Sequence, residues 1–558
     1  MSQWIHANGY KPERRGRLGG QNAQLSYKRT APRPAALPAR TAPVPHFARR
    51  LTVALLSCAR ALPTGVAPAR ALAPDLPALG DVAYDDLSPS NERRFGEQIM
   101  RQVRRDPAYL ADPDTHDYLN ALGFKLVSVS PARYMDFEFF AVRDPMLNAF
   151  ALPGGFIGVH SGLVLGSANE SELASVLAHE IGHVEQRHIA RMLAKQREGS
   201  FIAIGALLLA LLAARSGSSS SGDAAQAAIM AGQAAAVQQQ LNFSREAERE
   251  ADRVGFQILV GAGFDPAATA SFFTRLQQGT RIYESAAPEY LRTHPLTIER
   301  LSDIQNRARE SRVRPRPDSL DFQLVRSRLR VLQDESPQGL RDAALHFRNQ
   351  LDSRTTTSVT AAYYGLALAS MKLDEHAAAV EAARNARLSS QAPSPMLDKI
   401  VAQTLFAAAR TDGERADAVR LAREAVARYP VSRLSALNYV DLLQKSGRDE
   451  DVVAFLREQL AVSRSDPRLF ELLARSYERL GRRTLQHQAT AELYLLLGAV
   501  PAAADQLQLA RRANDADFYT MSEVDARLRQ LNRQLREYRE QLAREGRAPP
   551  DEDRQPRR

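Results

Sequence analysis

The sequence predicts a mainly α-helical protein with a small β-sheet, in which an α+β domain precedes an α-helical repeat domain. Strand periodicity and a Pro-Gly-Gly turn occur in one short stretch, residues 136–160, whereas helical periodicity dominates the rest of the chain after residue 88. Three glycines recur at intervals of 34 residues in the C-terminal half. The chain has 558 residues, 44% of them hydrophobic and 25% charged, a globular composition long enough for several domains.

Residues 1–73 are predicted to be a disordered extension followed by a secretory signal. A pair of arginines precedes the apolar run 51–56, and the small residues at 71–73 fit a cleavage site. Cys58, the only cysteine, is either removed with this segment or retained as a lipidated residue. The segment also holds twelve Lys and Arg and one acid, so it accounts for the net charge of +10. The remaining body is nearly neutral and gives no reason to expect nucleic acid as a partner.

Residues 85–311 are predicted to form the α+β domain. The elements expected in it are a helix from Glu92 to about Phe124, a strand at 136–142, a hairpin of strands at 147–152 and 156–160, and a helix that is capped at Asn169 and continues through Ala190 or beyond.

The segment 201–214 is an apolar run of 14 residues. It would extend over about 21 Å as a helix, whereas a bilayer core requires about 30 Å. Three placements are open: packed beneath the repeats, covering a cleft as a lid, or dipping into a membrane. Because a Ser/Gly linker follows at 216–222, we predict a mobile apolar element beside the functional site that meets a membrane or an unfolded client.

Residues 319–530 are predicted to be tetratricopeptide repeats, which follow a Pro/Arg linker at 312–318. Gly413, Gly447 and Gly481 keep the 34-residue period of this repeat, in which a glycine occupies the turn between two helices. An earlier unit has Asp374 at its turn position. Residues 531–558 are predicted to be a charged helix and a disordered tail.

The segment from His179 to His183 contains the pattern H-E-x-x-H within a helical context. Residues i and i+4 of a helix lie one turn apart, so His179 and His183 can direct ring nitrogens at one metal ion. Glu180 then lies beside the ion without binding it, where it can take a proton from the attacking water.

A catalytic zinc ion needs a third protein ligand. Glu248 and Asp252 lie four residues apart on a second predicted helix, so that Glu248 can bind the metal while Asp252 accepts an N–H from a ligand histidine. Glu246 and Glu250 are the competing choices, although helix phase turns them elsewhere. His188 stands five residues after His183 and is expected to be a polar structural contact.

The H-E-x-G-H pattern and the later S-R-x-x-E-x-E-A-D-R-x-G resemble the gluzincin metallopeptidase family of the HtpX heat-shock protease and the CAAX prenyl protease. The resemblance implies a zincin-type α+β metallopeptidase domain with one Zn²⁺ on His179, His183 and Glu248, and with Glu180 as general base. The N-A-F-x-x-P-G-G strand implies an edge to which extended substrate adds. The residues expected in that edge are Asn148, Ala149, Phe150, Ala151 and Leu152.

The Thr293-His294-Pro295-Leu296 segment with Arg300 also resembles the family, and it implies catalytic roles for His294 and Arg300. His294 would either stabilise the oxyanion or occupy the open metal position at rest; a simple contact at a helix start is the alternative. For Arg300 the alternative is a surface salt bridge.

The resemblance, together with the signal and the repeats, implies a periplasmic zinc endopeptidase. Its expected substrates are misfolded outer-membrane β-barrel proteins, whose assembly it would also assist, and its repeats would contact the barrel assembly machinery. An alternative is a repeat-based chaperone or scaffold with a latent protease site. In the lipidated case, Cys58 would anchor the protein to the outer membrane, and residues 201–214 would supply a peripheral membrane contact.

Overall fold

The computed structural model describes residues 88–131, 135–194, 245–282, 289–311, 313, 316–462, 466–513 and 515–544. The predicted signal with Cys58, the apolar run 201–214 and the C-terminal tail after Arg544 lie outside the described residues. Among the helices that are described, none combines the length and the apolar character that crossing a membrane requires.

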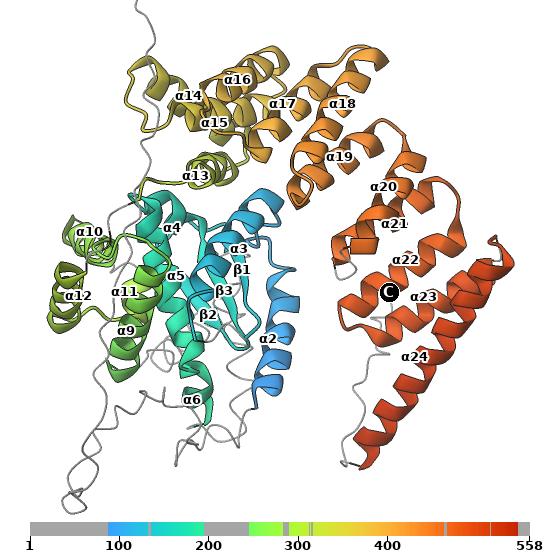
Figure 1. Cartoon of the computed structure of the whole chain (residues 1–558), viewed down its shortest axis with the longest axis horizontal. Helices are drawn as coiled ribbons and strands as arrows, with labels where there is room; N and C mark the ends of the chain where they lie inside the picture. Colours follow the sequence, from blue (N-terminus) through green and yellow to red (C-terminus); the bar gives the residue numbers. More distant parts are fainter. Residues whose placement is uncertain are drawn as a thin grey trace, which may run out of the picture. The chain divides into compact units, whose positions relative to one another are not determined.

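The protein is mainly α-helical with a three-stranded β-sheet (Figure 1). The strands are β1 (Glu138–Val142), β2 (Ala149–Leu152) and β3 (Phe156–His160), in the spatial order β1-β3-β2. β3 pairs with β1 in parallel and with β2 antiparallel. The predicted hairpin is therefore present, and β2 lies at an edge of the sheet.

The helices before the repeats are α2 (Pro89–Val103), α3 (Pro113–Val127), α4 (Ser161–Gly166), α5 (Glu170–Glu185), α6 (His188–Ala194), α9 (Arg245–Gly261), α10 (Ala268–Ile282), α11 (Glu289–Thr293) and α12 (Ile298–Glu310). Of these, α2, α3, α4 and α5 pack against the sheet, whereas α9 and α10 pack against α5, and α12 packs against α9 and α10. Successive strand residues point to opposite faces of the sheet. Phe139 and Ile157 belong to the hydrophobic core that includes α3 and α5, whereas Phe140 and Phe156 pack against α2.

The single helix predicted from Glu92 to Phe124 is wrong, because α2 and α3 are separate helices. The Asp112 side chain accepts a hydrogen bond from Thr115 N and starts a new helix at Pro113. A proline has no N–H to continue a preceding helix but fits the first turn of the next.

The predicted continuous helix from Asn169 through Ala190 is also interrupted. Asn169 does cap α5, since its side chain accepts a hydrogen bond from Glu172 N. However, Arg187 adopts a left-handed conformation with φ of 51°, which ends α5 and starts α6 in a new direction. The guanidinium of Arg187 forms an ion pair at 3.3 Å with buried Glu92, which holds this break against α2.

Two glycines allow α5 and α9 to approach closely. A Cβ atom on Gly182 would lie 2.9 Å from the carbonyl oxygen of Ala251, and one on Gly255 would lie 2.9 Å from the Cα of His179. Such distances are too short for any side chain. The close approach brings the acidic first turns of α9 over the H-E-x-x-H segment of α5.

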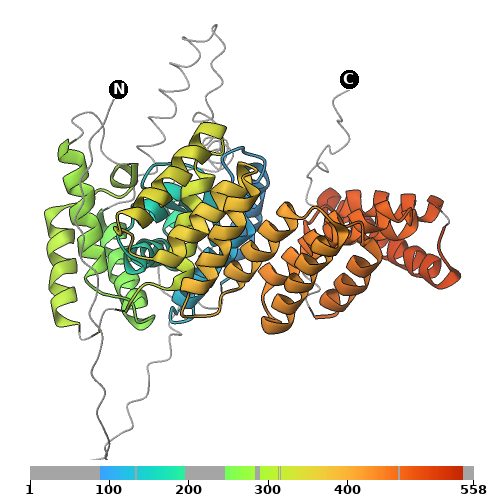
Figure 2. The same ribbon diagram turned by 90° about the horizontal axis from the view of Figure 1, so that it is seen from above.

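The C-terminal helices pack against one another in chain order (Figure 2). They are α13 (Leu320–Leu332), α14 (Pro337–Asp352), α15 (Val359–Lys372), α16 (His376–Ser389), α17 (Pro395–Ala408), α18 (Asp412–Arg428), α19 (Arg433–Lys445), α20 (Asp449–Val462), α21 (Pro467–Arg479), α22 (Arg483–Leu496), α23 (Val500–Ala513) and α24 (Phe518–Arg544).

The turns between these helices match most of the predicted repeat positions. Gly447 and Gly481 have φ values of 68° and 70°, and Asp374 has a φ value of 58° in the corresponding turn. Gly413 was predicted for the same role, but it lies inside α18. There, Thr411 and Glu414 form a reciprocal capping box, which starts the helix without a left-handed residue.

A buried ionic network joins the start of α3 to the first repeat helices. The Arg328 guanidinium of α13 donates to Asp112 Oδ2 at 2.8 Å and to the Tyr364 hydroxyl of α15 at 3.1 Å. It also pairs with Asp114 at 3.0 Å, and Asp114 pairs with Lys399 of α17. One hydrophobic core continues across the same junction, from α3 and α5 into α13–α17.

Replacing Arg328 with Leu is expected to destabilise the protein by about 3–5 kcal/mol, because Asp112 would lose its buried cationic partner and Asp114 would keep only Lys399. Thermal melting followed by circular dichroism at pH 7 measures the change. Arg420→Leu is the matched control: Arg420 is 60% exposed and pairs with Glu424, so its loss is expected to change the melting temperature little. Equal melting of the two variants would contradict the expectation.

The same network gives a pH dependence. Burial alone raises the pKa of Asp112, but the Arg328 guanidinium outweighs burial and lowers that pKa below its usual value. A carboxyl whose pKa is lower in the folded state stabilises the fold above its unfolded pKa of about 3.9, and this contribution is lost as the pH falls toward the folded pKa. The difference in melting temperature between wild type and Arg328→Leu is therefore expected to shrink below about pH 4.

Candidate metal centre

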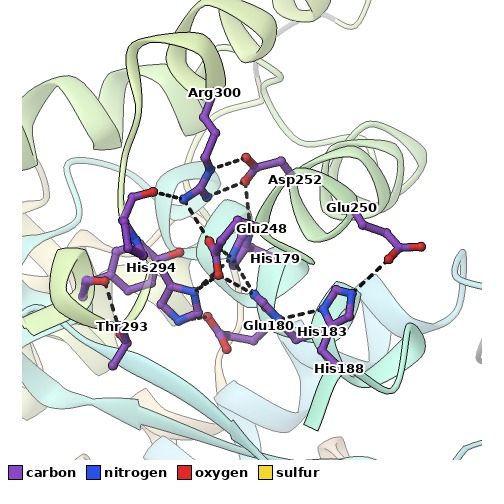
Figure 3. Close-up of polar contacts among 12 residues, drawn as sticks. His179, Glu180, His183, His188, Glu248, Glu250, Asp252, Thr293, His294 and Arg300 are labelled. Atoms are coloured by element: carbon purple, nitrogen blue, oxygen red, sulfur yellow. Dashed lines mark hydrogen bonds and ion pairs between the residues drawn. The ribbon is translucent and has the colours of Figure 1, made fainter. Parts of the chain in front are cut away.

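Helix α5 carries the two histidines of the H-E-x-x-H pattern into the protein interior. Every residue from Ser171 to Val184 is buried, including His179, Glu180 and His183. The Nε2 atoms of His179 and His183 lie 3.0 Å apart, as expected for ring nitrogens one helical turn apart that face the same point (Figure 3).

Two more groups reach the same point from other elements. Glu248 of α9 places its carboxylate 3.5 Å from His179 Nε2 and 3.4 Å from His183 Nε2. His294, which follows α11, directs its Nδ1 to within 3.0 Å of Glu248 Oε1 and 3.4 Å of His179 Nε2. Ligand atoms of the four residues lie within 4.8 Å of one another. The structure therefore brings together the residues that the two motifs and the His-Pro segment predicted.

Asp252 and Arg300 bind the side chains of His179 and Glu248 (Figure 3). Asp252 Oδ1 lies 3.0 Å from His179 Nδ1, and Arg300 binds Asp252 through Nε at 2.6 Å and Glu248 through Nη1 at 2.8 Å. Arg300 also donates to the carbonyl of Pro295 at 2.6 Å. Arg300 is buried, so the surface salt bridge considered for it does not occur.

The surroundings set the protonation of the two histidines on α5. Burial favours the neutral His179 ring, but its hydrogen bonds to Asp252 and Glu248 outweigh burial and raise the pKa of His179 to about 10. A metal that binds this ring must therefore displace a proton. Burial lowers the pKa of His183 well below its usual value, which leaves a neutral ring with a lone pair on one nitrogen.

Glu180 lies beside the cluster without joining it. Its carboxylate is buried, and His294 Nε2 lies 3.5 Å from Oε1. Burial raises the pKa of Glu180, an effect that the His294 and His179 rings and the backbone of Ala151 only partly offset. A buried carboxylate of raised pKa is suited to accept a proton.

The edge strand β2 runs next to Glu180, and α5 packs against it. The Asn148 carbonyl accepts a hydrogen bond from His160 N at 3.0 Å. Pairs alternate along an antiparallel ladder, so even-numbered residues of β2 bond to β3, while the backbone groups of Ala149 and Ala151 face the open edge. The predicted strand residues separate by face: Ala149 and Ala151 pack on the main core, Phe150 and Leu152 pack on the α2 side, and Asn148 is buried.

The donor set fits zinc. Three imidazoles and one carboxylate are the nitrogen and oxygen ligands that Zn²⁺ prefers, and three protein ligands with one exchangeable position are typical of catalytic sites. The Nδ1 atoms of His179 and His183 face Asp252 and His188, so their Nε2 atoms are the ones that converge on the cluster. Glu248 Oε2 is buried and pairs with Arg300 Nη1 at 2.8 Å, whereas Glu248 Oε1 lies 3.4 Å from His183 Nε2 and 3.0 Å from His294 Nδ1.

The competing acids on α9 point elsewhere, as helix phase predicted. Glu246 is 76% exposed and pairs with Arg249. Glu250 contacts His188 at 3.1 Å and Arg191 at 2.8 Å. Tyr290 was not among the predicted site residues, and its buried ring stacks on His294 with centroids 4.8 Å apart. Its position four residues before His294, at one helical turn, was the available signal.

A helix with H-E-x-x-H that faces a glutamate from a second helix defines the gluzincin class of zinc metallopeptidases. Peptidase family M48 matches residues 113–308 of this chain. The beta-barrel assembly-enhancing protease of Escherichia coli (strain K12) is 32% identical over 483 residues, which cover 85% of this chain and 94% of that protein. The chain belongs to peptidase family M48 and is a zinc metalloendopeptidase.

Other relatives match shorter parts. The putative beta-barrel assembly-enhancing protease of Vibrio cholerae is 41% identical over 259 residues, 46% of this chain and 52% of that protein. The mitochondrial metalloendopeptidase OMA1 of Schizosaccharomyces pombe is 30% identical over 235 residues, 41% of this chain and 65% of that protein. A solved tetratricopeptide repeat protein from Parabacteroides merdae covers 48% of this chain and 92% of its own, at 10% identity and a TM-score of 0.24, and this likeness carries no argument.

Proposed function

We propose that this endopeptidase uses His179, His183 and Glu248 as zinc ligands and Glu180 as general base. The convergence of the three ligand atoms beside the buried carboxylate of Glu180, one residue after the first histidine, carries the proposal. Bound zinc supplies Lewis acidity to a water molecule and to the scissile carbonyl. Glu180 accepts the proton of the attacking water and returns it to the leaving nitrogen.

We assign positioning roles to Asp252 and Arg300. Asp252 holds the proton on His179 Nδ1, so the Nε2 lone pair faces the metal. Arg300 fixes both acidic side chains of α9 at once, because it binds Asp252 and Glu248 together. We propose that His294 occupies the fourth metal position in this resting arrangement, since its Nδ1 points at the ligand atoms.

The open edge of β2 is the proposed substrate-binding element. An extended peptide that pairs with Ala149 and Ala151 would run beside Glu180 and the cluster. This recognition uses backbone groups, so it accepts unfolded chains of many sequences.

Replacing Ala149 with Pro tests this edge, because the backbone of Ala149 faces the open side, whereas that of Ala151 contacts Glu180. Proline removes the outward N–H without removing a hydrogen bond to β3, so cleavage of an unfolded protein such as casein is expected to fall at least about tenfold while zinc stays bound. Ala149→Gly keeps the N–H and is the matched control, expected to retain most activity. Unchanged cleavage by the proline variant would place substrate elsewhere.

We further propose that the enzyme acts in the periplasm on misfolded outer-membrane β-barrel proteins and assists their assembly. Support comes from the signal-like segment at 1–73 and from a relative, named for enhancing beta-barrel assembly, that matches along 94% of its length. We propose the repeats as the element that contacts the assembly machinery. Abundance of unfolded barrel proteins in a deletion strain, with and without this chain, is the test; no difference would contradict it.

A further inference from the structure

A series of hydrogen-bonded side chains extends from His183 to Glu250, away from the metal-binding cluster (Figure 3). His183 Nδ1 lies 2.9 Å from Nδ1 of His188, and His188 Nε2 lies 3.1 Å from Glu250 Oε2. Arg191 donates to the same Glu250 oxygen at 2.8 Å. His188 is buried, whereas the Glu250 side chain is 32% exposed.

The ring tautomers of His183 and His188 follow from these hydrogen-bond contacts. His183 can bind a metal through Nε2 only if Nδ1 carries the proton. That proton lies between two ring nitrogens, so His188 must accept it on an unprotonated Nδ1. The proton of neutral His188 is then on Nε2, where it is donated to the Glu250 carboxylate. Each group therefore has a defined donor or acceptor role.

The path of the backbone makes this contact possible. On a continuous helix, His188 would lie about 140° around the axis from His183 and could not reach its ring. The left-handed Arg187 redirects the chain, so that His188 turns back onto His183. The ion pair of Arg187 with Glu92 stabilises this conformation.

We propose that His188 is a positioning residue that fixes the tautomer and orientation of His183, with Glu250 as the far anchor. This inference rests on the proposed role of His183 as a zinc ligand. The two histidines of α5 are then held differently: His179 directly by a buried carboxylate, and His183 through an intervening imidazole to a carboxylate at the surface. Outer groups of this kind contribute about 10–100-fold to metal affinity.

Zinc affinity of the full chain, measured by competition with a chromophoric chelator, tests the proposal. His188→Leu is expected to weaken zinc binding about 10–100-fold and to alter the visible spectrum of the Co²⁺-substituted protein. His188→Asn places an amide oxygen near the position of Nδ1 and is expected to recover part of the affinity. Glu250→Ala removes the anchor and is expected to give a smaller loss. Glu246→Gln, on the exposed side of the same helix, is the control and should bind zinc as wild type does.

His183→Ala separates failure of this inference from failure of the zinc site. If His183→Ala still binds zinc tightly, the proposed ligand set is wrong. If His183→Ala loses zinc while His188→Leu keeps wild-type affinity, only the positioning role is overturned. Equal loss in His188→Leu and His188→Asn, with equally lowered melting of the metal-free proteins, would also overturn it, because packing alone would then explain the effect.

Discussion

Glu180→Gln is expected to lower proteolysis by a factor of about 10²–10⁴ and to leave zinc bound, because the amide cannot accept the proton of the attacking water. The three proposed ligands are untouched by this change. Glutamine has nearly the same volume as glutamate, so the buried site should not collapse. The measurements are casein cleavage by purified protein and zinc content of the same preparation.

The same variant separates enzyme from scaffold. If the repeats carried the biological role alone, Glu180→Gln would restore a deletion strain as fully as wild type. We expect incomplete restoration, because the buried carboxylate of Glu180 lies beside the ligand cluster, where it is suited to accept a proton. Wild-type cleavage by the pure variant would remove Glu180 from the mechanism.

The candidate metal-binding residues could be predicted from the sequence because each motif lies within a few residues of a single helix. His179 and His183 share a helix face through the 3.6-residue period, and the phase of α9 distinguishes Glu248 from Glu246 and Glu250. The structure places Glu246 at the surface and Glu250 against His188. What remained open was whether two helices separated in sequence would meet, and the contacts at Gly182 and Gly255 explain why they do.

The contacts of His188 could not be predicted in the same way. Periodicity predicted one helix over residues 169–190. Arginine has no preference for the left-handed conformation, so the residue type at Arg187 gives no sign of the break. The ion pair between Arg187 and Glu92 spans 95 residues of sequence, so only the folded arrangement reveals it. The left-handed turn predicted at Gly413 was wrong for a related reason, since a capping box can start a helix without a left-handed glycine.

Glu248→Gln is expected to cause the largest loss of zinc affinity among the carboxylate variants, because a neutral amide is a much poorer ligand for a divalent ion. Its carboxylate also pairs with Arg300 at 2.8 Å, so the variant leaves that buried cation with Asp252 alone. The poorer amide ligand and the loss of one negative charge both lower the affinity of the site for a divalent cation.

Metal content after dialysis against a weak chelator, followed by proteolysis in excess zinc, measures the effect. The expected result is a largely metal-free protein whose cleavage returns only partly when zinc is raised. Glu246→Gln removes a carboxylate two residues away that is 76% exposed and should keep its metal. Full metal occupancy in Glu248→Gln would exclude Glu248 as a required ligand. His294, whose ring nitrogen already lies 3.4 Å from that of His179, would then be the next candidate for the third ligand.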